Sequence, residues 1–240
     1  MKKIHLILTG LSLTIILLSL NRLTPWTQGY LQPFDFLRYM DLFAMIPIPL
    51  FSVLLYWLLR NEILYDHPFR RTLLYTILNL LLITGIYFFA AGSGDHEVTN
   101  YLNLRFCNVG KTDSPICNII DYNDDVFSHY IYYIGFVLLN IPLMLFEYHL
   151  PRKKEATKKD LILVSINGLF IALGIFANLA FEEAIIDLIV FGSVMLLSLY
   201  LLYRQNFKVA KLPVTFYFAV SYTVGVAGTI LYKLATNTPF

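Results

Sequence analysis

Two short polar patterns in a largely apolar chain carry the residue types of a catalytic or metal-binding site. The first is Asp95-His96-Glu97-x-x-Asn100 and the second is Asp124-Asp125-x-x-x-His129-Tyr130. Residues four apart on a helix share a face, which places Asp125 beside His129. Each pattern adjoins an apolar run, and the two runs are consecutive along the chain. Because consecutive membrane helices are antiparallel neighbours, we expect His96 and His129 to meet at one end of a bundle.

Two imidazoles and a carboxylate form a common ligand set for zinc or another divalent metal. The patterns therefore predict a metal site with His96 and His129 as ligands and Asp125, or alternatively Asp95, as the third. A metal-bound water is a nucleophile near neutral pH, and a second carboxylate such as Asp95 would serve as its general base. This chemistry predicts hydrolysis or group transfer.

A third acidic pattern, Glu182-Glu183-x-x-x-Asp187, lies in a short turn between two apolar runs. Asp187 falls about one helical turn inside the second run, where an ionisable side chain is costly and usually faces a polar interior. We therefore add Glu182, Glu183 and Asp187 to Asp95 as candidate catalytic residues.

The same residues also have a purely structural interpretation. Glycine commonly ends a helix and aspartate commonly begins one, so Gly92 and Gly94 predict a helix end and Asp95 predicts the cap of the next helix. Asp124 or Asp125 would cap the following helix. The chain has no His-Glu-x-x-His and no Gly-x-Ser-x-Gly motif, so both interpretations stay open at the level of sequence.

The elements that must position these residues are membrane helices. The chain has 240 residues, of which 58% are hydrophobic and only 14% charged, with a mean hydropathy of +0.64. This composition excludes a soluble domain, and a net charge of +2 gives no reason to expect a nucleic-acid partner. We predict an all-α polytopic membrane protein, a bundle of seven transmembrane helices forming one integral membrane domain over residues 1–240. The predicted spans are 4–20, 41–59, 72–91, 127–147, 161–180, 184–203 and 213–232, with a long outer loop at 92–126.

The first span also has the basic start and apolar run of a signal peptide. No small-x-small pattern follows Leu20, so we favour a retained membrane helix. In the second span, Pro47 and Pro49 predict a kink.

Most of the 18 basic residues fall in segments that lie on one side of the predicted bundle. The positive-inside rule makes that side cytoplasmic, with the N-terminus inside and the C-terminus outside. The low charge and short loops favour a bacterial inner membrane, with the histidine site facing the periplasm or the cell exterior. Membrane lipids are then the expected surroundings.

Cys107 and Cys117 lie in the predicted outer loop, and we predict a disulfide between them because that side is oxidising.

Seven helices with histidines and acidic residues at their ends are similar in architecture to membrane metal-hydrolases of the alkaline ceramidase type. Those enzymes have paired histidines in the last helix, and residues 213–232 contain none, so no residue role is carried over.

The sequence leaves two functional hypotheses. One is a metal-dependent hydrolase or transferase acting on a lipid or lipid-linked substrate. The other is a non-enzymatic protein, either a small transporter or a membrane assembly or interaction protein.

Overall fold

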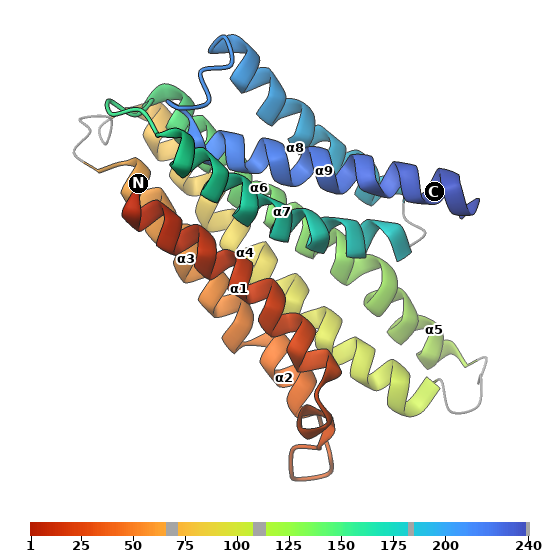
Figure 1. Cartoon of the computed structure of the whole chain (residues 1–240). Coiled ribbons are helices and arrows are strands. Elements are labelled where there is room, and N and C mark those ends of the chain that lie inside the picture. Colours follow the sequence, from red (N-terminus) through yellow and green to blue (C-terminus); the bar gives the residue numbers. More distant parts are fainter. Residues whose placement is uncertain (66–71, 108–113, 182–184, 239–240) are drawn as a thin grey trace.

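The protein is a bundle of long helices in a computed structural model that describes residues 1–65, 72–107, 114–181 and 185–238. Seven helical segments in these ranges are long and apolar enough to cross a membrane, which confirms the predicted helical class (Figure 1). The only strand-like pairing in the described ranges is a bridge between Tyr30 and Arg38. The helices are α1 (Lys2–Leu23), α2 (Tyr39–Met45), α3 (Pro47–Ile63), α4 (Leu73–Leu102), α5 (Pro115–Tyr122), α6 (Ser128–His149), α7 (Lys158–Phe181), α8 (Ile185–Arg204) and α9 (Pro213–Thr236).

Helices α4 and α6 pack against each other along their length (Figure 1). Helix α1 packs against α3 and α7, while α9 packs against α7, α8 and α6. The core between them consists of fully buried aliphatic and aromatic side chains, such as Leu8, Leu59, Leu82, Leu139 and Phe191. Helix α1 contributes to this core, and its retention as a membrane helix stays a prediction.

The second predicted span is broken, as its prolines predicted. Helix α2 ends at Met45, and α3 starts with Pro47 as its first residue. Proline is well suited to that position because its missing N–H is one that a helix start leaves unpaired anyway. Ile46 lies between the two helices and still donates its backbone N–H to the carbonyl of Leu42 at 3.0 Å.

The predicted outer loop at 92–126 is wrong for most of its length. Helix α4 continues past Gly92 and Gly94 to Leu102, and a π-helical turn, η3, extends it to Cys107. After residues 108–113, α5 begins at Pro115 and leads through a second π-helical turn, η4 (Asn123–Phe127), directly into α6. The predicted helices 72–91 and 127–147 are therefore too short. Polar side chains do not interrupt backbone hydrogen bonding, so a rise in polarity did not mark the end of either helix.

Small residues allow α7 and α9 to approach closely. A Cβ on Gly168 would lie 3.2 Å from the carbonyl oxygen of Tyr217, and one on Gly225 would lie 2.7 Å from Cγ2 of Ile175. The spacing of small residues in the sequence, Gly168 with Ala172 and Ser221 with Gly225, predicts helix–helix contacts in these two spans. The distances at Gly168 and Gly225 confirm them.

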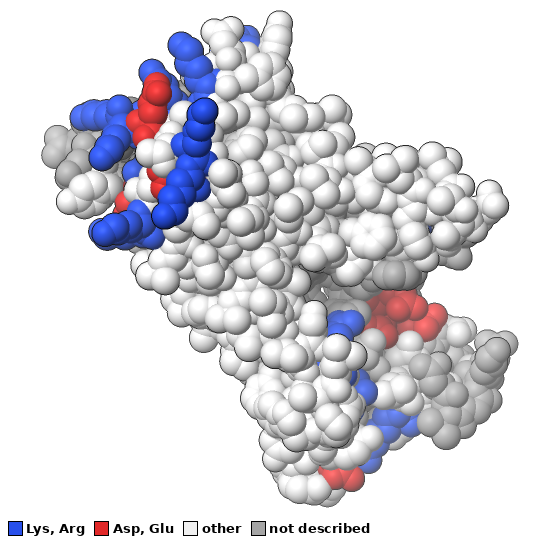
Figure 2. Space-filling view, viewed as in Figure 1, with Lys and Arg blue, Asp and Glu red and all other residues white. Residues whose placement is uncertain are grey.

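The two ends of the bundle differ in charge. Lysine and arginine side chains gather at the end that holds the N-terminus (Figure 2). At this end the α6–α7 and α8–α9 loops are joined by backbone hydrogen bonds, from Arg152 N to Lys211 O at 3.1 Å and from Ala156 N to Ala210 O at 2.8 Å. The side of the membrane that each end faces stays a prediction.

A buried carboxylate attaches α9 to α6 at the same basic end. Glu147, near the end of α6, is 1% exposed. It accepts hydrogen bonds from Val214 N at 3.0 Å, Thr215 N at 2.6 Å and Thr215 Oγ1 at 2.9 Å. The first amides of a helix have no partner within the helix and favour negative charge. Glu147 therefore caps α9 from a neighbouring helix.

Candidate functional site

Glycines bring α4 and α6 together at the level of the two histidines. A Cβ on Gly92 would lie 2.4 Å from Tyr132 N, and one on Gly135 would lie 2.2 Å from Phe89 N. Neither distance is compatible with a side chain, so only glycine permits this approach. His96 lies about one turn beyond Gly92. The close approach therefore positions this part of α4 against the start of α6.

The two imidazoles converge, as the sequence predicted. The ring centroids of His96 and His129 are 4.9 Å apart. Nδ1 of His96 lies 3.1 Å from Oδ1 of Asp124 and 3.4 Å from the Asp124 backbone carbonyl oxygen. The His129 ring in turn contacts Tyr133, at a centroid distance of 5.7 Å. A carboxylate, two imidazoles and a phenol thus form a continuous group across α4, η4 and α6, which we call the histidine cluster (Asp124, His96, His129 and Tyr133).

The carboxylate of the histidine cluster is not the one chosen from the sequence. Asp124 is 3% exposed and faces His96, whereas Asp125, the predicted third metal ligand, is exposed. Both belong to the π-helical turn η4. A π-turn contains more residues than the 3.6 of an α-helix and changes which residues share a face. Such turns often occur at functional sites, but the spacing of apolar residues did not reveal this one.

The Asp124 carboxylate is held from more than one side. Its Oδ2 accepts a hydrogen bond from Asn103 Nδ2 at 3.4 Å, and Ser128 Oγ donates to the Asp124 backbone carbonyl at 2.6 Å. Oδ1 faces His96 at ion-pair distance but lacks an aligned hydrogen-bond donor among the described residues. A buried carboxylate with one oxygen directed only at an imidazole fixes the orientation of that ring.

Asp95 does not cap a helix, contrary to one sequence interpretation, because it lies inside α4. Its side chain is partly buried, and Oδ2 has no hydrogen-bond partner in the part of the chain that the structure describes. The predicted catalytic role of Asp95 stays a prediction. Its neighbour Glu97 is buried, 7% exposed, and its Oε1 lies 3.8 Å from Nη2 of Arg22 at the end of α1.

A polar cavity of about 330 Å³ lies at the same end of the bundle as the histidine cluster, and Glu97, which directly follows His96, is in its wall. None of the four residues of the histidine cluster is among the described residues that line it. In the space-filling view, basic and acidic side chains meet in a hollow of the surface away from the basic end (Figure 2). Glu97 directly follows His96 in sequence, so α4 presents Glu97 to the cavity and His96 to the histidine cluster. The lining residues are Arg22, Gln28, Met40, Glu97 and Asn100.

A separate ion pair supports the wall of this cavity. Arg38 donates from Nε and Nη2 to the two carboxylate oxygens of Asp41 at 2.8 and 2.7 Å, and both side chains are buried. Nη2 of Arg38 also lies 3.4 Å from Oδ1 of Asn100. Asp41 is thus fully used by a bidentate arginine, which gives it a structural role at the start of α2.

The remaining predicted site residues have different outcomes. Asp187 is 2% exposed in the first turn of α8, and its catalytic role is untested. Glu182 and Glu183 lie outside the described residues.

The predicted disulfide is confirmed: Cys107 and Cys117 are bonded, with their Cα atoms 5.5 Å apart. It connects the end of η3 to α5 and closes the tip of the α4–α6 hairpin.

The described residues contain no group of three or more His, Cys, Asp or Glu side chains placed to hold a metal ion. The histidine cluster as it stands has two imidazoles and one carboxylate already directed at an imidazole. The chemistry that this arrangement offers directly is proton transfer.

No family of known proteins matches the chain, and neither the curated proteins nor the solved structures include a significant match. The functional interpretation therefore depends on the chain's own residues.

Proposed function

We propose that the protein is an integral membrane enzyme that hydrolyses a lipid or lipid-linked substrate, or transfers a group from it, with the histidine cluster as its acid–base centre. The observation that carries the proposal is the contact between His96 Nδ1 and the buried Asp124 carboxylate, 3.1 Å apart, with the His129 ring beside it. A carboxylate that orients an imidazole through one ring nitrogen leaves the other nitrogen available for proton transfer.

In this mechanism the Asp124 backbone carbonyl and carboxylate, 3.4 and 3.1 Å from Nδ1, favour the His96 tautomer that carries its proton on Nδ1. Nε2 of His96 then has a lone pair and takes a proton from water or from a substrate hydroxyl as that group attacks. The proton that His96 has taken up then passes to the leaving group, either directly or through His129, whose ring lies 4.9 Å away. Asp124 is a positioning residue, because it acts through His96.

The polar cavity at the same end of the bundle supplies the substrate contacts in this proposal. The Arg22 side chain is 61% exposed, and its only ion pair in the described ranges is the 3.8 Å contact with Glu97. A guanidinium matches the geometry of phosphate, the charged group common in lipid-linked intermediates. Gln28 and Asn100 add neutral hydrogen-bonding groups on the same wall. These features suit the anionic part of an amphiphile whose apolar part stays in the membrane.

A metal-dependent form of the same reaction needs a further ligand in addition to the two imidazoles. Asp95, with its unpartnered Oδ2, is the nearest candidate in sequence to His96, and Asp125 would have to turn inward from its exposed position. In that form a bound zinc ion would supply the activated water. The geometry favours the metal-free form, because that form uses the Asp124–His96 contact unchanged.

Two features support an outward-facing site. The histidine cluster lies at the end of α4 and α6 opposite the basic end, which the positive-inside rule assigns to the cytoplasm. The Cys107–Cys117 disulfide is at the same end as the histidine cluster, and disulfides persist in oxidising compartments. We therefore propose that the reaction takes place at the outer leaflet, facing the periplasm or the cell exterior.

The direct test is lipid conversion by the purified full chain. The protein is incubated in nanodiscs with a total lipid extract from a bacterial membrane, and the lipid species are followed by mass spectrometry. A species that disappears with wild type and persists with His96→Gln supports an enzyme. We expect at least a 100-fold lower rate for His96→Gln and about a 10- to 100-fold lower rate for Asp124→Asn.

Asp125→Asn is the matched control, because it makes the same change one residue away on the exposed side of η4. We expect its rate to stay close to wild type, and His149→Gln, an imidazole loss at the basic end, should behave likewise. Equal losses in Asp124→Asn and Asp125→Asn would contradict the acid–base assignment. Conversion of no species by a folded protein would favour the non-enzymatic alternative.

Metal content separates the two forms of the enzyme proposal. About one zinc per purified chain, lost in both His96→Ala and His129→Ala without loss of folding, would establish the metal-dependent form. Activity that persists after chelation would establish the metal-free form that we favour.

A further inference from the structure

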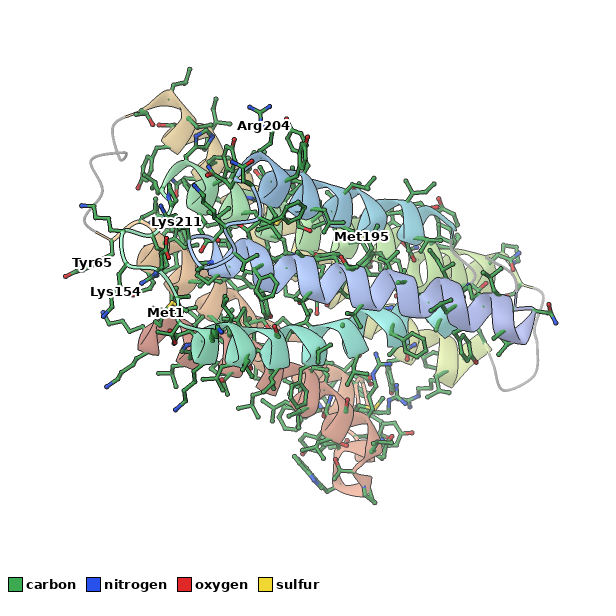
Figure 3. All side chains as sticks on the ribbon, turned by 45° about the horizontal axis from the view of Figure 1, so that its top comes forward. Met1, Tyr65, Lys154, Met195, Arg204 and Lys211 are labelled. Carbon is green, nitrogen blue, oxygen red and sulfur yellow. A yellow bond between two sulfur atoms is a disulfide. The ribbon has the colours of Figure 1, made fainter. Side chains whose placement is uncertain are left out.

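A second cavity, of about 280 Å³, opens at the basic end of the bundle. Three of its lining residues are consecutive cations, Arg152, Lys153 and Lys154, in the loop that follows α6. Figure 3 shows Tyr65, Lys154, Lys211 and Met1 at this same end of the molecule. The full lining consists of Glu62, Ile63, Tyr65, Glu147, Leu150, Arg152, Lys153 and Lys154.

The two carboxylates in the wall are already engaged. Glu147 accepts three hydrogen bonds from the first residues of α9, as described above. Glu62 lies 3.7 Å from Nζ of Lys3. Lys3 in turn stands over the Tyr65 ring, 5.6 Å from its centroid. The negative charges of the cavity are therefore directed at a helix N-terminus and at a lysine from α1.

The three cations of the wall form no close ion pair among the described residues, and only Arg152 acts on a wall carboxylate, Glu147, at longer range. Within the described ranges, none of Arg152, Lys153 and Lys154 lies at ion-pair distance from a carboxylate. Nε of Arg152 is buried and has no hydrogen-bond partner among these residues. A buried guanidinium N–H without an acceptor is costly. An acceptor that enters the cavity would remove this cost.

We propose that this cavity binds one phosphate group, and that in the membrane this phosphate belongs to the headgroup of an anionic lipid. Arginine recognises phosphate oxygens with paired donors, and lysines contribute point charges. Ile63 and Leu150 make part of the wall apolar, which suits the glycerol and the first methylenes of a lipid. Basic cavities between helices at a membrane surface are a known type of headgroup site.

The site would also explain how the α6–α7 loop is kept in place. Its backbone is bonded to the α8–α9 loop by Arg152 N and Ala156 N, and its side chains surround the cavity. The single negative charge of a bound headgroup phosphate would reduce the repulsion among three like charges on consecutive residues. The proposal is independent of the proposed enzyme function, because it concerns the opposite end of the bundle.

The test is native mass spectrometry of the full chain in detergent, titrated with phosphatidylglycerol or with phosphatidylcholine. We expect one phosphatidylglycerol to bind more tightly than any further copies and more tightly than phosphatidylcholine. Each removed charge should weaken binding by about fivefold, so Lys153→Gln/Lys154→Gln should weaken it by about 25-fold. Arg152→Gln, tested separately, should also lose the hydrogen bonds of its guanidinium.

The matched control is Lys158→Gln/Lys159→Gln, which removes the same charge from two exposed lysines in the first turn of α7. Lys153 and Lys154 are also exposed, so neither double variant should affect folding, which a melting curve verifies. An equal loss of binding in both double variants would overturn the site and leave only diffuse attraction. No preference for phosphatidylglycerol would also overturn it. Inorganic phosphate that competes at equal concentration would overturn the lipid assignment.

Discussion

The two ends of the bundle use buried carboxylates in opposite ways. At the basic end, Glu147 accepts three hydrogen bonds from α9, and all three of these bonds serve packing. At the other end, Asp124 is about equally buried, but among the described residues its Oδ1 faces only the ring of His96. A fully bonded carboxylate holds a fold together. One that is directed at a single titratable partner can influence the proton affinity of that partner.

The comparison shows that burial alone does not identify a functional acid. The partners of the carboxylate distinguish the two cases. Backbone amides at the start of a helix indicate a cap, whereas an imidazole near a cavity indicates a functional site. This distinction can be tested by removing each interaction and asking whether stability or activity changes. The following predictions run from the largest expected effect to the smallest.

Glu147→Gln should destabilise the protein by about 3 kcal/mol, because an amide replaces a charged acceptor and turns an N–H group toward other donors. The measurement is thermal unfolding in detergent. Glu155→Gln is the control, since Glu155 is exposed and only 3.8 Å from Lys211 Nζ, a surface ion pair of small value. If Glu147→Gln melted like wild type but altered lipid conversion, the structural assignment of the basic end would be wrong.

Cys107→Ser/Cys117→Ser should lower stability by about 2–3 kcal/mol in the chain-entropy treatment of a loop of this size. The loss should be concentrated at the histidine end, because the disulfide closes the tip of the α4–α6 hairpin. Hydrogen exchange followed by mass spectrometry checks this, with faster exchange in 95–107 and 114–129 and unchanged exchange in α7 and α9. Uniform acceleration over the whole chain would show that the two ends do not unfold separately.

Gly92→Ala should cost about 1–3 kcal/mol, because its Cβ would meet Tyr132 N at 2.4 Å and force α4 away from α6. It should also separate His96 from His129 and reduce lipid conversion. Gly94→Ala is the matched control on the same helix, since the nearest atom to its Cβ would be Met45 Cγ at 3.9 Å. Both variants are compared by melting temperature and by activity, and equal behaviour would contradict the close-packing argument.

Single cysteines should report which side of the membrane each end faces, with little effect on stability. Lys154→Cys at the basic end should react with a membrane-impermeant maleimide only after permeabilisation. Phe34→Cys at the other end, where Phe34 is 85% exposed, should react in intact cells. The reverse pattern would invert the orientation predicted from the basic residues.

The sequence predicted the helical class because apolar runs long enough to cross a bilayer determine where helices pass through it. The break at Pro47, the contacts at Gly168 and Gly225, the disulfide and the convergence of His96 and His129 followed from local rules and were found. The boundaries of α4 and α6 did not follow. Gly92 looked like a helix end, but its function is to admit Tyr132, which is a property of a distant segment.

The choice of Asp125 over Asp124 has a similar cause. Counting four residues back from His129 assumes an α-helix, and the π-turn η4 changes that register. The Glu147 cap could not be derived from local sequence either, because its partners lie in α9. Pairwise contacts across the bundle decided these details, and local periodicity contains no information about them.

The length of α4 determines the depth of the histidine cluster. The continuous helical segment Leu73–Cys107 contains 35 residues, and at about 1.5 Å per residue His96 lies roughly 35 Å from its start. Even with a tilt of about 20° this exceeds the roughly 30 Å of hydrocarbon in a bilayer. With Leu73 at the inner edge of the hydrocarbon, we expect both rings to lie where acyl chains give way to polar ester and phosphate groups. A lipid could present its reactive bond there without leaving the leaflet, and water has access from the same side.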